Sequence, residues 1–110
     1  MKLVGRIPAG RLEGEPLVRL DYPPFGVVVV RTESGIYAME ESCNHAGASM
    51  ATGWVEDDCL ICPVHRYAFD LKTGALVRPK GLCPPQRTFV VRREGDDVVV
   101  YDPFQLSILG

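Results

Sequence analysis

Short apolar runs, separated at close intervals by glycine and proline, are the dominant pattern along this chain of 110 residues. The 11 glycines and 9 prolines interrupt every apolar segment before it reaches the length of an ordinary helix. This punctuation predicts an all-β protein. We expect strands at residues 2–7, 16–20, 27–30, 36–39, 54–55, 59–61, 67–71, 75–77, 88–92 and 98–101.

Two segments of the sequence give the clearest local signals, one for a strand and one for a turn. Val27 to Val30 are β-branched throughout, which is typical of a strand that is buried on both faces. Glu94 to Asp97 lies between two apolar segments and predicts a tight hairpin. No stretch shows a sustained helical period with capping residues, and the only helical turn that we expect is a short one around Glu40 to Ser42.

Length and charge narrow the class of protein. A chain of 110 residues predicts one domain, spanning residues 1–110, with its own core. The hydrophobic fraction of 46% and the charged fraction of 24% are ordinary for a soluble globular protein. A net charge of −2 and a pI near 5.6 provide no basic surface, so we expect no binding to nucleic acid or to anionic membranes.

The distribution of apolar residues also bears on localisation. The longest strongly apolar run, Phe25 to Val30, is far shorter than the ~20 residues of a membrane-spanning helix. The first residues contain charged side chains and Pro8 in place of the apolar centre of a signal peptide. We therefore expect a cytoplasmic protein.

The candidate chemistry is concentrated between Cys43 and His65. A cysteine and a histidine stand at each end, as Cys43-x-His45 and Cys62-x-x-His65, and the chain contains no other histidine. The 16 residues from 46 to 61 can loop out as a hairpin and bring the two ends together. Two thiolates and two imidazoles converging on one point indicate a metal site. A structural zinc site uses the same donors, but zinc fingers normally pair like ligands with like in longer spacings.

The neighbouring residues make the pattern more specific, because they resemble the two ligand loops of Rieske-type [2Fe–2S] ferredoxins. The first loop reads Cys43-Asn44-His45-Ala46-Gly47-Ala48-Ser49, and the second reads Cys62-Pro63-Val64-His65, followed by Phe69-Asp70 and Thr73-Gly74. The resemblance implies one [2Fe–2S] cluster per chain, with Cys43 and Cys62 on one iron and His45 and His65 on the other. It also implies an antiparallel β-sandwich or barrel as a base, at residues 1–40 and about 86–104. A small cluster-binding subdomain, at about 41–85, is inserted into that base.

Departures from the high-potential Rieske proteins indicate the ferredoxin subtype. Those proteins join their two loops by a disulfide, whose positions here are Ala48 and Val64. They also place a serine and a tyrosine where this chain has Tyr67 and Phe69. Arg66 stands at a position that is usually glycine, which puts the local loop conformation in doubt.

The resemblance implies a one-electron carrier and not an enzyme. Rieske oxygenases hold a second iron with two histidines and a carboxylate, and both histidines of this chain are already assigned to the cluster. The partners would be a flavoprotein reductase and a terminal oxygenase, or another oxidoreductase. The alternative is a non-catalytic subunit of a larger enzyme, similar to the small Rieske-like subunit of assimilatory nitrite reductases.

The remaining cysteines, Cys59 and Cys83, leave two interpretations open. They could form a redox-sensing disulfide, or each could fill a small apolar niche. We favour the second interpretation, because unpaired cysteine is among the most buried residue types and the cytosol is reducing.

Overall fold

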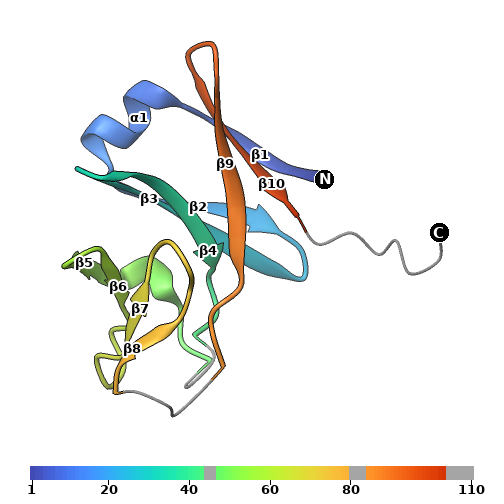
Figure 1. The fold of residues 1–110 in the computed structure, drawn as a ribbon. Coiled ribbons are helices and arrows are strands. Elements are labelled where there is room, and N and C mark those ends of the chain that lie inside the picture. Colours follow the sequence, from blue (N-terminus) through green and yellow to red (C-terminus); the bar gives the residue numbers. More distant parts are fainter. Residues whose placement is uncertain (44–46, 80–83, 104–110) are drawn as a thin grey trace.

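The computed structural model describes residues 1–43, 47–79 and 84–103, and Figure 1 shows the arrangement of their elements. Within these described residues, ten strands form two antiparallel sheets, which confirms the all-β prediction. The large sheet has the order β1-β10-β9-β4-β3-β2, and the small sheet has the order β5-β6-β7-β8. The strands of the large sheet are β1 (Lys2–Pro8), β2 (Leu17–Tyr22), β3 (Phe25–Thr32), β4 (Gly35–Glu40), β9 (Thr88–Glu94) and β10 (Asp97–Asp102).

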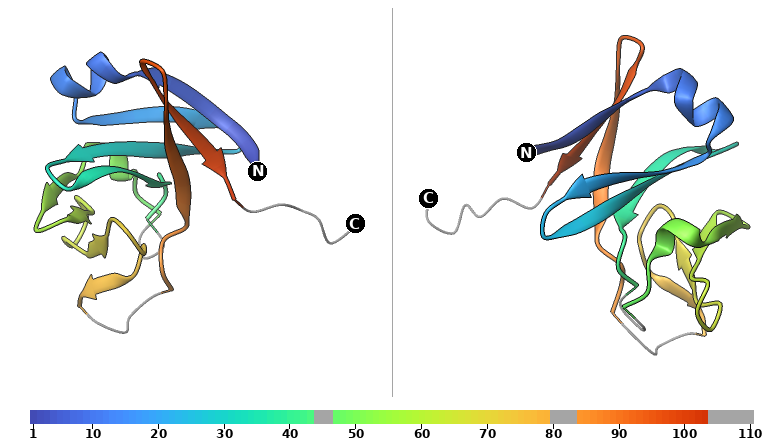
Figure 2. Two further views of the ribbon diagram at one scale, coloured as in Figure 1. Left: turned by 45° about the horizontal axis from the view of Figure 1, so that its top comes forward. Right: turned by 180° about the vertical axis from the view of Figure 1, so that it is seen from behind.

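The small sheet is formed by a single stretch of the chain between β4 and β9. Its strands are β5 (Trp54–Glu56), β6 (Cys59–Ile61), β7 (Ala68–Asp70) and β8 (Leu76–Arg78), preceded by the short helix η1 (Met50–Thr52). The two further views in Figure 2 agree that this sheet lies to one side of the large sheet. The edge strands β1 and β2 of the large sheet come into contact, so that this sheet is nearly closed on itself.

Strand β3 separates two hydrophobic cores. Val27 and Val29 pack inside the large sheet with Ile7, whereas Val28 and Val30 face the small sheet. All four valines are fully buried, which confirms the expected strand with two buried faces. The alternation follows from the two-residue period of a strand. The core between the two sheets also contains Cys43, Met50, Leu60, Cys62, Tyr67, Phe69 and Leu71.

Two expectations about helices were wrong. A helix, α1 (Ala9–Gly14), follows β1 even though its sequence contains two glycines and its N-terminus has no side-chain cap. Burial of Leu12, which is 0% exposed, offsets the weak intrinsic preference of this segment for a helix. Residues 40–42 form no helical turn, because the Glu41 amide donates to the Gly26 carbonyl at 2.9 Å and Ser42 bridges to Ser49.

The hairpins follow the sequence closely. The turn between β9 and β10 falls at Gly95, whose φ of 61° suits glycine, and the turn between β5 and β6 falls at Asp57 and Asp58. Within the described part of the chain, no helix is long and apolar enough to span a lipid bilayer.

Candidate metal centre

The first ligand loop begins at the end of β4 in the large sheet and ends at η1. Backbone hydrogen bonds close it, since the Cys43 amide donates to Ala48 O at 2.9 Å and the Gly47 amide donates to Cys43 O at 2.7 Å. The bridge between Ser42 and Ser49 pairs the two arms of the loop just outside these bonds. Cys43 is 1% exposed, so the loop carries its thiol into the core between the sheets.

The second ligand loop follows β6. Cys62 is fully buried, and its amide donates to Tyr67 O at 2.8 Å, which closes a turn over residues 63–66. His65 and Arg66 both lie in the left-handed region, with φ of 64° and 57°. Side chains other than glycine and asparagine rarely adopt this conformation. The unusual residue type at position 66 therefore coincides with a backbone conformation that favours glycine.

The two loops bring Cys43 and Cys62 together. Burial is the main cause that raises the pKa of Cys62 to about 11; a backbone hydrogen bond from Val64 opposes it, and a hydrogen bond with the Cys43 thiol adds to it. At neutral pH the Cys62 thiol is therefore protonated unless a cation is bound nearby. A metal ion reverses this preference, because coordination deprotonates a thiol outright. A buried, contacting thiol pair fits a site that receives positive charge.

The histidines of the motif are less fully defined. His65 is exposed, and its ring lies 6.5 Å from the ring of Tyr67 at an angle of 50°. His45 lies outside the described residues. Among the residues that the structure does describe, no three side chains of His, Cys, Asp or Glu are grouped as a metal would require. The structure thus brings together the two predicted sulfur ligands, and the imidazole ligands stay a prediction.

The donor set fits the implied group. Two sulfurs in an apolar core and two imidazoles in the same pair of loops match the mixed Cys₂His₂ ligation of a Rieske [2Fe–2S] centre. The surrounding core residues Met50, Leu60, Phe69 and Leu71 are almost wholly buried, so they keep water from the sulfurs. Phe69 has no hydroxyl to donate to sulfur, as the sequence implies.

One buried polar residue near the loops, Gln86, belongs to no sequence motif that would identify it. Gln86 is 2% exposed, and its Nε2 donates to Ser42 O at 2.9 Å and to Glu40 O at 3.3 Å. The Gln86 amide donates to Gly74 O at 2.8 Å. A Cβ on Gly74 would lie 2.1 Å from Gln86 O, and its φ of 78° also favours glycine. Gln86 therefore links the first ligand loop to the segment that follows the second.

Cys59 lies apart from the ligand pair. It is 5% exposed and packs with Ile61, Ala68 and the partly buried Val77 in a small separate cluster. Burial, followed by the charge of Asp70, raises the pKa of its thiol. These surroundings match the apolar niche that we expected for Cys59, whereas Cys83 lies outside the described residues.

Comparison with known proteins agrees with this geometry. The family model of the Rieske [2Fe-2S] domain matches residues 7–87. The ferredoxin component of biphenyl 2,3-dioxygenase from Rhodococcus jostii (strain RHA1) is 35% identical over 94 residues, covering 84% of this chain and 85% of that protein. The ferredoxin of carbazole 1,9a-dioxygenase from Nocardioides aromaticivorans IC177 superposes with a TM-score of 0.80 at 26% identity, covering 93% of this chain and 99% of that one.

Two further structures are informative. A ferredoxin in complex with the oxygenase of carbazole 1,9a-dioxygenase matches with a TM-score of 0.79 at 25% identity, covering 96% of this chain and 95% of that one. A small subunit of an NADPH nitrite reductase matches with a TM-score of 0.75 at 21% identity, covering 91% of this chain and 98% of that one. The second likeness shows the fold alone, so it does not favour the alternative of a fixed enzyme subunit.

The fold and the site define an iron–sulfur protein that transfers electrons and is not itself a catalyst. The chain belongs to the Rieske [2Fe-2S] domain family. It carries one [2Fe–2S] cluster and is an electron carrier of the ferredoxin type.

Proposed function

We propose that Cys43, His45, Cys62 and His65 bind the cluster, and that the protein carries electrons from a flavoprotein reductase to a terminal oxygenase. The observation that carries this proposal is the buried contact between Cys43 and Cys62, formed by two separate loops in the core between the sheets. The names of the ferredoxin relatives, which are components of dioxygenase systems, support an oxygenase as acceptor.

The two sides of the thiol pair differ in their exposure, and this difference indicates where an electron can leave. When bound, the cluster supplies a centre that gains and loses one electron. Apolar side chains cover the cysteines on the side of the core, whereas His65 and Arg66 are exposed and Val64 is 37% exposed. A partner can therefore approach closely at the His65 end of the second loop. We expect the acceptor to dock on this surface.

The first experiment is to purify the protein anaerobically and to measure its iron, sulfide and zinc content. We expect two irons and two sulfides per chain, and the EPR signal of a Rieske centre after reduction. Replacing Cys43 or Cys62 with alanine should abolish this signal. The matched control is Cys59→Ser, which changes a buried cysteine of β6 outside the ligand pair and should leave the spectrum intact. Stoichiometric zinc in a colourless protein would refute the assignment.

The partners require a separate experiment. Rapid mixing of the reduced protein with an oxygenase should oxidise it in a second-order reaction, and a flavoprotein reductase should reduce it again. A free carrier should elute from size exclusion as a single chain. Elution of the native protein within a larger enzyme would instead support the alternative of a fixed subunit.

We also propose that residues 41–85 form a cluster-binding subdomain on a base of residues 1–40 and about 86–104, and that the protein works in the cytoplasm. In the part of the chain that the structure describes, strands β5 to β8 pair only with one another, which supports the division. The described cysteines Cys43, Cys59 and Cys62 form no disulfide, which suits a reducing compartment. Hydrogen exchange tests the division, since removal of the cluster should deprotect amides in 41–85 first. Cell fractionation tests the localisation.

A further inference from the structure

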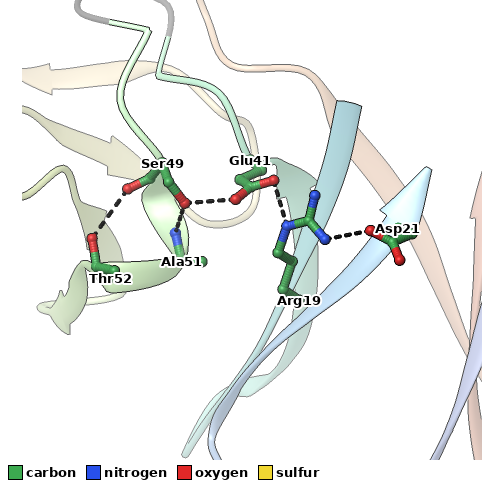
Figure 3. A network of polar contacts seen from close by, with 6 residues as sticks. All are labelled: Arg19, Asp21, Glu41, Ser49, Ala51 and Thr52. Atoms are coloured by element: carbon green, nitrogen blue, oxygen red, sulfur yellow. Dashed lines mark hydrogen bonds and ion pairs between the residues drawn. The ribbon is translucent and has the colours of Figure 1, made fainter. Parts of the chain in front are cut away.

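A chain of charged and polar side chains connects strand β2 to the first ligand loop (Figure 3). Arg19 lies at its centre, with Nε 2.6 Å from Glu41 Oε1 and Nη1 2.5 Å from Asp21 Oδ1. The other oxygen of Glu41 accepts a hydrogen bond of 2.6 Å from the Ser49 hydroxyl. Ser49 Oγ in turn accepts from the Ala51 amide at 3.1 Å. One carboxylate therefore connects the base of the protein to η1.

Glu41 and Ser49 stand on the two arms of the loop that carries Cys43. The backbone joins these arms by two hydrogen bonds, from the Cys43 amide to Ala48 O at 2.9 Å and from the Met50 amide to Glu41 O at 2.8 Å, which together form the bridge between Ser42 and Ser49. The side-chain hydrogen bond between Glu41 and Ser49 adds a third connection where the two arms of the loop meet. The positions of Cys43 and Ala48, at the two ends of the loop, are therefore fixed by groups that lie outside the ligand set.

Strand β3 leaves space for this arrangement at Gly26. A Cβ at this position would lie 2.3 Å from Glu41 Oε1 and 2.8 Å from Arg19 Nη2. The register places Gly26 opposite Asp21 and Arg19 opposite Val28, which is the next pair on the same face of the sheet. Because both nearby atoms belong to the ends of flexible side chains, an alanine would displace the ion pair while the backbone of the strand could remain in place.

The exposure of these side chains decides how much the network contributes to stability. Ion pairs between exposed side chains stabilise a protein by only ~0–1 kcal/mol, and the Arg19 side chain is 41% exposed. The Glu41 side chain is only 17% exposed, and its hydrogen bond with Ser49 is charge-assisted. Both oxygens of the Glu41 carboxylate are thus engaged, one by the Arg19 guanidinium and the other by the Ser49 hydroxyl.

We propose that Arg19 and Glu41 are positioning residues for the cluster: through Ser49 they hold the first ligand loop in the one conformation that presents Cys43 to the metal. This inference rests on the proposed function, because it requires Cys43 to be a ligand. Without the Glu41–Ser49 connection, the loop samples several conformations. The cluster then dissociates faster, and its ligand geometry becomes heterogeneous.

Four variants test the proposal. Ser49→Ala removes the hydroxyl, and Ser49→Thr restores it with one additional methyl group. Glu41→Gln keeps the shape and an acceptor for Ser49 but removes the charge that binds Arg19. Gly26→Ala leaves all the polar groups in the chain but displaces them. The matched control is Asp97→Asn, which breaks an exposed ion pair with Arg6 of 3.5 Å in the large sheet, away from the ligand loops.

Three readouts separate positioning from simple stability. They are the rate of cluster loss in the presence of a chelator, the EPR line width of the reduced protein, and the midpoint potential. We expect cluster loss to be about tenfold faster in Ser49→Ala and Gly26→Ala, as loss of one charge-assisted hydrogen bond predicts. These variants should also show broader EPR lines and a shifted potential. Ser49→Thr should match the wild type, Glu41→Gln should be intermediate, and Asp97→Asn should change none of the three.

The possible failures are distinguishable. If the unmodified protein gives no Rieske signal, the proposed function fails before any variant is compared. If the unmodified protein gives the signal and both Ser49→Ala and Gly26→Ala keep its rate of cluster loss, line width and potential, the positioning role is wrong, even if their melting temperatures fall. Should Ser49→Ala not accumulate as folded protein, Glu41→Gln and Gly26→Ala decide the question by the same three readouts.

Discussion

Replacement of Arg66 by glycine should stabilise the protein, although the residue lies beside a predicted ligand. Arg66 has a φ of 57°, and a left-handed conformation costs a residue with a Cβ about 1–2 kcal/mol. Glycine adopts this conformation without that cost, but it loses about 0.5–1 kcal/mol more backbone entropy on folding. The difference between the midpoints of these two ranges predicts a net gain of about 0.75 kcal/mol for Arg66→Gly.

The charge of the arginine must be separated from its backbone conformation. Arg66→Ala provides this comparison, since it removes the same guanidinium but keeps the Cβ. We expect the glycine variant to be more stable than the alanine variant by about 1 kcal/mol, which is a difference of ~4 °C in melting temperature for a domain of this size. Arg31→Gly is the opposite control, because Arg31 is exposed in the extended strand β3 and glycine should destabilise the protein there.

The assay is anaerobic thermal unfolding of the cluster-loaded protein at a fixed scan rate, followed by visible absorbance and by far-UV circular dichroism. A fixed rate is needed because cluster loss makes the unfolding irreversible. The same samples provide the midpoint potential, which should fall equally in Arg66→Gly and Arg66→Ala because both lose one positive charge. Equal melting temperatures for these two variants would refute the argument from backbone strain.

Three further predictions concern other parts of the molecule. Gln86→Met should lower the free energy of unfolding by about 1–3 kcal/mol in urea, because it leaves the carbonyl of Ser42 without its buried donor; an unchanged midpoint would show that another donor replaces it. Burial, and then the 2.6 Å hydrogen bond to Asp102, raise the pKa of Tyr22 above its ordinary value of 10. The protonated Tyr22 hydroxyl therefore contributes fully to stability below about pH 10, and this contribution is lost as the pH rises through the raised pKa of the folded protein. Tyr22→Phe should therefore be less stable at pH 7 but should decline less steeply in urea titrations above pH 10; an identical alkaline slope would contradict this. In protein-film voltammetry we expect a potential below zero, in the lower part of the Rieske range of about −150 to +300 mV, that is flat near pH 7 and falls by up to ~59 mV per pH unit at alkaline pH; a slope already present at pH 7 would be evidence against this.

The sequence was sufficient to predict the features that depend on local chemistry. The two-residue alternation of the valines in β3 predicted a strand with two buried faces, because each side chain direction follows from the backbone alone. Turn residues such as Gly95 marked the hairpins, because glycine readily adopts the positive φ that a tight turn requires. The types and spacing of Cys43, His45, Cys62 and His65 indicated a metal site, since ligand chemistry is a property of the side chain itself. The resemblance of the two surrounding loops implied the [2Fe–2S] cluster.

Other features were decided by contacts between distant parts of the chain. Helix α1 depends on burial of Leu12 against the large sheet, which no local preference of its glycine-containing segment predicts. The contact of Cys43 with Cys62 follows from the packing of two sheets across one core. Arg19 meets Glu41 because the register of β2 on β3 places it beside Gly26. A shift of one residue in that register would turn Arg19 to the opposite face of the sheet, and register is fixed only when the buried faces of the whole domain assemble.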